Sequence, residues 1–233
     1  MYAVENYFNY FTEVEERYQR RRGTGLLLST VDWALIETWK DAGIPLEAVL
    51  RGIDSTFDKS DRRPKPKKIN SLAYCAQEVL AEAEALREAS VGGSRREPEA
   101  SAGLESAEIV GFFQQNAEKL RHVRSTPEVQ LVAEESAATL TDLAAIMGGT
   151  SPPRLQLEEL ERRLTVLEEK LLAALTVSAT ENELFELRTE ADREIAPYRS
   201  KMPGAQIQQL QKQFIHKRLF EKAKIPRLSL FYL

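Results

Sequence analysis

The chain has few of the residues that build disulfide frameworks, metal centres or membrane spans. Cys75 is the single cysteine among 233 residues, so no disulfide forms within one chain, which fits a reducing compartment. The two histidines, His122 and His216, lie far apart and offer no local zinc site. The unbroken apolar runs, such as 26–28, are much shorter than a bilayer core of about 30 Å requires. We expect a cytoplasmic protein that binds no metal and needs no cofactor.

Signatures of catalysis are also missing. The sequence has no Gly-x-x-x-x-Gly-Lys-Ser/Thr loop, no Gly-x-Gly-x-x-Gly and no His-Glu-x-x-His. Acid pairs at helical spacing exist, for example Glu186 and Glu190, but neither histidine completes the Glu-x-x-His motif of a carboxylate-bridged metal site. We therefore expect a protein that is not an enzyme.

What the chain does contain is helical periodicity, and it predicts an all-α fold. Aromatic residues on a helix from about residue 7 to 22 form one stripe, which is either core or a base-stacking surface. Ser29 with Asp32 predicts a capping box, Pro45 predicts the start of the next helix, and Asn70 or Ser71 predicts the start of another.

Composition divides the chain into four parts. The stretch over 91–104 is rich in glycine, serine and proline, and we predict that it is a linker because such residues favour flexible backbone. The predicted parts are an N-terminal helical domain (1–90), a flexible linker (91–104), a helical hairpin (105–149), and a coiled-coil hairpin with a basic C-terminal helix and an apolar tail (150–233).

A leucine seam begins the last part. Its residues alternate three and four apart, as in a coiled coil. Two arrangements fit: an antiparallel hairpin with the helix that follows over 181–195, or a homodimer. The seam residues are Leu157, Leu160, Leu164, Leu167, Leu171 and Ala174.

Positive charge is concentrated in a loop, although the whole chain has a formal net charge of -4. Such local density points to a polyanion or an acidic partner. The loop spans residues 59–68 and has one acid, Asp61. Its cations are Lys59, Arg62, Arg63, Lys65, Lys67 and Lys68.

A second basic segment covers residues 199–227, with eight Lys or Arg residues and one acid, Glu221, whereas residues 128–192 have fourteen acids and five bases. The cations either neutralise the acidic helices or face outward and bind DNA or RNA with steep salt dependence. For the second alternative we assign to the interface Arg199, Lys201, Lys212, Lys217, Arg218, Lys222 and Lys224.

The C-terminal tail is strongly apolar. It either docks on its own domain or is the peptide by which a protein partner is held. The side chains available for partner binding are Leu228, Leu230, Phe231 and Tyr232.

Within residues 32–74 the chain reads Leu35-Ile36-x-x-Trp39, then Gly43-Ile44-Pro45-x-Glu47-x-Val49-Leu50-x-x-Ile53, the basic loop, and Ile69-Asn70-Ser71-Leu72-x-Tyr74. This pattern resembles the helical domain of DnaD-like bacterial primosome proteins, over about a fifth of the chain. The resemblance implies a domain that helps bind DNA and bring the replicative helicase to an origin. After Tyr74 the chain has Glu78 and Val79 where that family has Ile and Trp.

Two functions follow from these patterns. One is a helical adaptor in DNA replication that binds DNA or RNA without sequence preference and holds a protein partner, such as a replicative helicase or its loader. The alternative is a structural subunit of a larger assembly, whose cations meet acidic protein surface.

Overall fold

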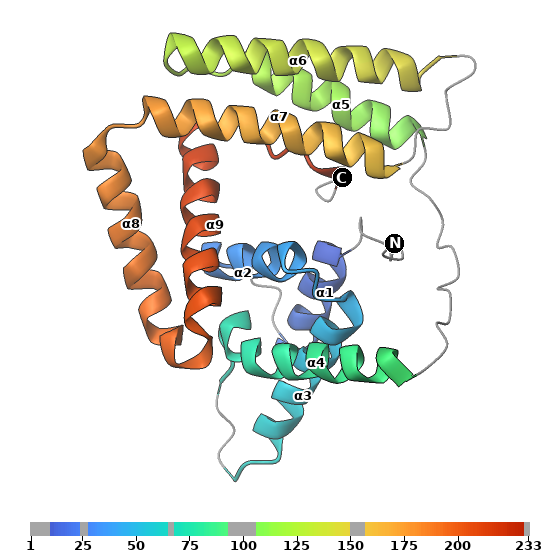
Figure 1. Ribbon diagram of the computed structural model, residues 1–233, viewed down its shortest axis with the longest axis vertical. Helices are drawn as coiled ribbons and strands as arrows, with labels where there is room; N and C mark the ends of the chain where they lie inside the picture. The colour runs from blue at the N-terminus through green and yellow to red at the C-terminus, as the bar shows by residue number, and fades with distance from the viewer. Residues whose placement is uncertain (1–9, 24–27, 65–67, 93–105, 150–156, 231–233) are drawn as a thin grey trace. The chain divides into compact units, whose positions relative to one another are not determined.

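The computed structural model describes residues 10–23, 28–64, 68–92, 106–149 and 157–230 (Figure 1). Every regular element within these ranges is a helix, which confirms the predicted all-α fold. The chain forms two compact units, of which unit 1 combines residues 1–99 with 188–215 and unit 2 combines 100–187 with 216–233. In the described ranges no helix is both long enough and apolar enough to cross a membrane.

Unit 1 consists of N-terminal helices and a segment that returns from the C-terminal part of the chain. Its α3 packs against α1 and α4, and its short helix η2 packs against α2 and η3. The elements are α1 (Tyr10–Arg22), α2 (Thr30–Asp41), α3 (Leu46–Asp61), η2 (Leu72–Tyr74), α4 (Ala76–Gly92), the end of α8 (Glu181–Ile195), η3 (Ala196–Lys201) and the start of α9 (Gly204–Ala223).

The aromatic stripe of α1 is core. Tyr10, Phe11 and Tyr18 are buried, and the Phe11 ring stacks on Trp33 with centroids 3.6 Å apart. Buried rings cannot stack on bases, so the base-stacking alternative is wrong for these residues. The N-terminal end of the predicted stripe, before residue 10, lies outside the described residues.

The helices α3 and α4 approach most closely at Gly52. A β-carbon placed on Gly52 would lie 2.6 Å from both the Cα and the backbone N of Val79. Real β-carbons do not approach backbone atoms so closely, so only glycine fits this crossing without moving a helix.

Cys75 lies between η2 and α4 and is fully buried. Burial, which disfavours the thiolate, raises the pKa of the Cys75 thiol to about 12. Because the thiolate is the reactive form, we expect this thiol not to react with a disulfide reagent in the folded chain at pH 8 and to react once urea unfolds it. A fast reaction without urea would contradict this expectation.

The same pKa predicts how stability depends on pH. An unfolded thiol ionises near pH 8.5 while the folded one stays protonated, so the unfolded state gains stability as the pH rises above that value. Between about pH 9 and 11, the stability advantage of the wild type over Cys75→Ala should shrink by about 1.4 kcal/mol per pH unit. Urea unfolding of both chains across that range measures the difference, and a pH-independent difference would refute it.

Unit 2 contains the predicted helical hairpin and the leucine seam. The hairpin consists of α5 and α6, and α7 packs on α6. The seam was predicted to pair with the helix over 181–195, but the structure packs α7 on α6 instead. Periodicity in a sequence shows which face of a helix is buried but not which element covers that face. The elements are α5 (Ser106–Arg121), α6 (Pro127–Met147), α7 (Leu157–Ser178), the start of α8 and the end of α9. Of the predicted seam residues, the buried ones are Leu160, Leu164, Leu167 and Leu171. Leu175 is buried where the prediction had Ala174, which is half-buried.

The predicted C-terminal part, residues 150–233, is split between the two units. Residues 188–215 group with unit 1, and the remainder groups with unit 2. The predicted linker at 91–104 includes the junction at residues 99 and 100, but from residue 93 it lies outside the described residues.

Candidate nucleic-acid interface

The basic loop starts where α3 ends. The backbone N–H of Arg62 donates to the Asp58 carbonyl at 3.2 Å, and that of Arg63 donates to the Ser60 carbonyl at 3.1 Å. Lys59 does not belong to the loop as predicted, because it lies in the last turn of α3. These two hydrogen bonds therefore fix the backbone at the point where the chain leaves α3.

The far end of the loop is fixed by buried hydrogen bonds. The Tyr18 hydroxyl donates to the Ile69 carbonyl at 3.3 Å, and both residues are buried. Burial raises the pKa of Tyr18 well above its ordinary value, so the hydroxyl stays protonated and remains a donor. The loop is thus held at both ends by unit 1.

Asp32 connects this end of the loop to α2. Its buried carboxylate accepts from the Ser71 hydroxyl at 2.6 Å and from the Leu72 N–H at 2.8 Å. It also accepts from the Ser29 N–H at 3.3 Å and the Ser29 hydroxyl at 2.9 Å, which confirms the predicted capping box. One carboxylate therefore caps α2 and positions the start of η2.

The η2–η3 junction brings the residues that follow the basic loop next to the start of the second basic segment. Tyr74 of η2 meets Tyr198 of η3 edge to face, with ring centroids 5.6 Å apart. Burial raises the pKa of the Tyr198 hydroxyl, with a hydrogen bond to Ser71 acting in the opposite direction. Lys68 precedes η2 by a few residues, and Lys201 ends η3, so cations far apart in sequence lie on neighbouring elements of unit 1.

No local pattern in the sequence indicated the pairing of these two tyrosines. The only signal is that both are aromatic residues beside basic segments.

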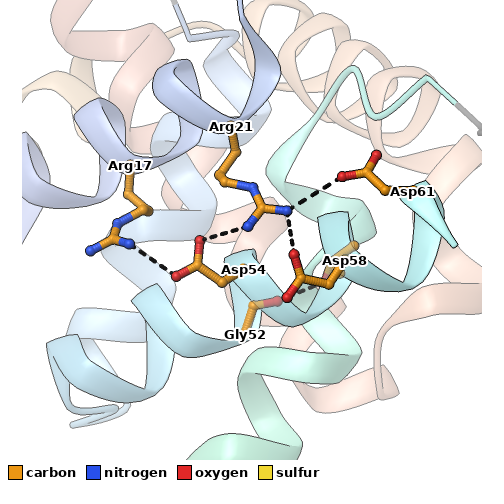
Figure 2. Close-up of polar contacts among 7 residues, drawn as sticks. Arg17, Arg21, Gly52, Asp54, Asp58 and Asp61 are labelled. Carbon is orange, nitrogen blue, oxygen red and sulfur yellow. Dashed lines mark hydrogen bonds and ion pairs between the residues drawn. The ribbon is translucent and has the colours of Figure 1, made fainter.

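An acidic face of α3 meets two arginines of α1, as Figure 2 shows. Arg21 contacts Asp54 at 3.4 Å, Asp58 at 2.6 Å and Asp61 at 3.6 Å, and Arg17 contacts Asp54 at 3.0 Å. The hydrogen bond with Asp58 raises the pKa of Arg21, which stays charged. These two arginines are thus occupied in joining α1 to α3.

Several predicted interface cations are paired with carboxylates inside their own unit. The alternative that the cations neutralise acidic neighbours therefore holds for these residues. The pairs are Lys59 with Glu78 at 2.6 Å, Arg199 with Asp192 at 2.7 Å, Lys217 with Glu221 at 3.6 Å, Arg218 with Glu221 at 2.9 Å, and Lys222 with Glu183 at 3.2 Å.

Six other predicted cations have no acidic partner among the described residues. All are exposed except Lys201, which is half-buried. Two further loop residues, Lys65 and Lys67, lie outside the described residues. The six cations are Arg62, Arg63, Lys68, Lys201 and Lys212 in unit 1, and Lys224 in unit 2.

The predicted partner-binding tail is partly buried. Leu228 and Leu230 have no exposed surface, and their backbone N–H groups donate to Glu168 and Glu161 of α7. Of the two alternatives for the tail, docking on its own chain is the one seen for these leucines. Phe231 and Tyr232 lie outside the described residues.

A protein-family model described as "Uncharacterised protein" matches residues 9–95, the N-terminal part of unit 1. Neither the curated proteins nor the solved structures give a match. Across the described ranges, no group of three or more His, Cys, Asp or Glu residues is placed to hold a metal ion.

Proposed function

We propose that this chain is a non-enzymatic cytoplasmic adaptor that binds nucleic acid through unit 1 and brings a protein partner to it. The observation that carries this proposal is the η2–η3 junction, where the short helix that follows the basic loop packs against residues 196–201. In the loop itself, Arg62, Arg63 and Lys68 are exposed without an acidic partner among the described residues. Lysine and arginine contacts to phosphate carry no base sequence information, so binding is tolerant of sequence.

The resemblance to DnaD-like primosome proteins supports a role in bacterial DNA replication. The partner is then a replicative helicase or its loader. Of the cations predicted at the outset, the proposal retains those of unit 1 that have no acidic partner among the described residues, together with Lys65 and Lys67.

A salt titration of binding to duplex DNA tests the proposal. Each phosphate contact contributes about 0.9 to the slope of log K against log salt concentration, because a counterion is released. The triple variant Arg62→Glu, Arg63→Glu and Lys68→Glu should therefore bind more weakly and lose about 3 from that slope.

The matched control reverses three exposed cations of unit 2, with Lys119→Glu, Arg124→Glu and Lys170→Glu. It changes the net charge equally, so it separates a local interface from a general charge effect. The proposal fails if both variants lose the same affinity, or if the wild type binds without dependence on salt.

A structural subunit without nucleic-acid binding is the second candidate. Large apolar side chains exposed in unit 2 favour it, because such side chains are typical of protein interfaces. Native mass measurement of the chain copurified from its source cell would show a stable complex that survives nuclease treatment. The residues concerned are Leu131, Ile146, Val166, Val177 and Phe185.

A further inference from the structure

The last described residues of unit 2 form a strap along α7. We define the strap as residues 225–230, which follow α9 and contain no helical turn of α type. Ile225, Leu228 and Leu230 are buried. The strap therefore contributes to the core of unit 2.

Two glutamates of α7 bind the strap through its backbone as well as its side chains. Glu168 accepts from the Leu228 N–H at 2.7 Å and from Nε of Arg227 at 2.8 Å. Glu161 accepts from the Leu230 N–H at 2.9 Å and from the Ser229 hydroxyl.

The strap runs antiparallel to α7, because Leu228 meets Glu168 and Leu230 meets Glu161. The two glutamates are seven residues apart, two helical turns, so they lie on one face of α7. The backbone N–H groups of Leu228 and Leu230, two residues apart in the strap, reach these two carboxylates. This face of α7 is thus a site that holds the Arg-Leu-Ser-Leu segment in one register.

The hinge that turns the strap back is strained. Lys224 has φ +55°, a left-handed conformation that its β-carbon disfavours and that glycine adopts readily. It directly follows Ala223, the last residue of α9, and the Ile225 N–H closes the end of the helix on the Phe220 carbonyl at 3.0 Å. Pro226 further restricts the connection, so the hinge is both short and strained.

We propose that the strap exchanges between two copies of this chain, so that each strap docks on the α7 of the other copy. A second copy presents the same Glu161 and Glu168 site, so exchange recreates every strap contact. Opening the hinge relieves the strain at Lys224, and short strained hinges favour exchange of this kind. The product is a closed symmetric dimer.

Charge reversal at one pair tests the exchange with full-length chains. One chain carries Glu168→Arg and the other carries Arg227→Glu, so each has like charges facing at its own strap. Mixed together, the Arg227 strap of the first docks on the Glu168 site of the second, and the reverse dock is also complementary. We expect native mass spectrometry to detect a heterodimer bound on the order of 100-fold more tightly than either homodimer.

The control carries Glu168→Arg and Arg227→Glu in the same chain. It restores opposite charges at its own strap and should form no heterodimer with the wild type beyond the level of the wild-type homodimer. If the mixture stays monomeric while this control recovers the thermal stability lost by the single variants, the strap docks only on its own chain and the proposal is wrong.

A second measurement applies if the single variants do not fold. Wild-type chains with and without ¹⁵N label are mixed at high concentration, and dimers containing both labels are counted. We expect such dimers to form and their fraction to fall in Lys224→Gly, because glycine removes the hinge strain. Absence of dimers at every concentration, or an equal fraction in Lys224→Gly, would overturn the exchange.

Discussion

Replacing Gly52 with alanine is expected to lower the free energy of unfolding of unit 1 by about 2 to 3 kcal/mol. The new β-carbon would stand 2.6 Å from backbone atoms of Val79, which cannot rotate away as a side chain can. The α3–α4 packing must therefore loosen, and that cost exceeds the gain of up to about 1 kcal/mol that alanine offers over glycine in a helix. Urea unfolding followed by tryptophan fluorescence measures the effect, because both tryptophans, Trp33 and Trp39, lie in unit 1.

Gly111 in α5 is the matched control. A β-carbon at Gly111 meets no atom within 4 Å, so only the helix-propensity gain remains. We expect Gly111→Ala to stabilise unit 2 by up to about 1 kcal/mol, as followed by circular dichroism. Equal stabilisation by both substitutions would show that α3 and α4 do not meet closely at Gly52.

Asp32→Ala should be the most damaging polar substitution, costing about 3 to 7 kcal/mol. The Ser29 N–H and hydroxyl lose the carboxylate that accepts from them, which accounts for about 1 kcal/mol. The Ser71 hydroxyl and the Leu72 N–H, both buried, would also lose their acceptor, at about 1 to 3 kcal/mol for each unsatisfied donor. Urea unfolding followed by tryptophan fluorescence again reports the change.

Glu183→Ala is the comparison that separates the cap from the buried bonds. Glu183 occupies the same position in a capping box with Thr180, but on an exposed part of α8. Its loss should destabilise the chain much less than the loss of Asp32. Similar losses would mean that the bonds from Asp32 to η2 contribute nothing.

Local signals in the sequence were sufficient for most of the helices. Ser29 with Asp32 predicted the start of α2, and Pro127 occupies the first turn of α6. The alternation of leucines predicted a buried face on α7. Each of these features depends on residues within one or two turns of one another, which is why a single sequence reveals them.

Contacts between distant segments could not be predicted in the same way. No residue near Gly52 in the sequence indicates that Gly52 will pack against Val79. The periodicity of α7 likewise did not indicate that α6 and the strap would pack on it. For the candidate site, counting charge located the cations but could not show that Lys59 pairs with Glu78 while Arg62 and Arg63 have no such partner. Which cations remain available depends on tertiary packing, and this is the part of the site that only the structure supplies.

The discontinuous composition of unit 1 has a consequence for biosynthesis. Tyr74 meets Tyr198, and the Gln213 amide donates to Asp41 at 2.5 Å, yet all of residues 100–187 are translated between these partners. At about 5 to 20 residues per second, a ribosome needs roughly 5 to 20 seconds to make that stretch. Throughout this interval the nascent N-terminal helices lack their late partners, so final assembly of unit 1 follows synthesis of most of unit 2.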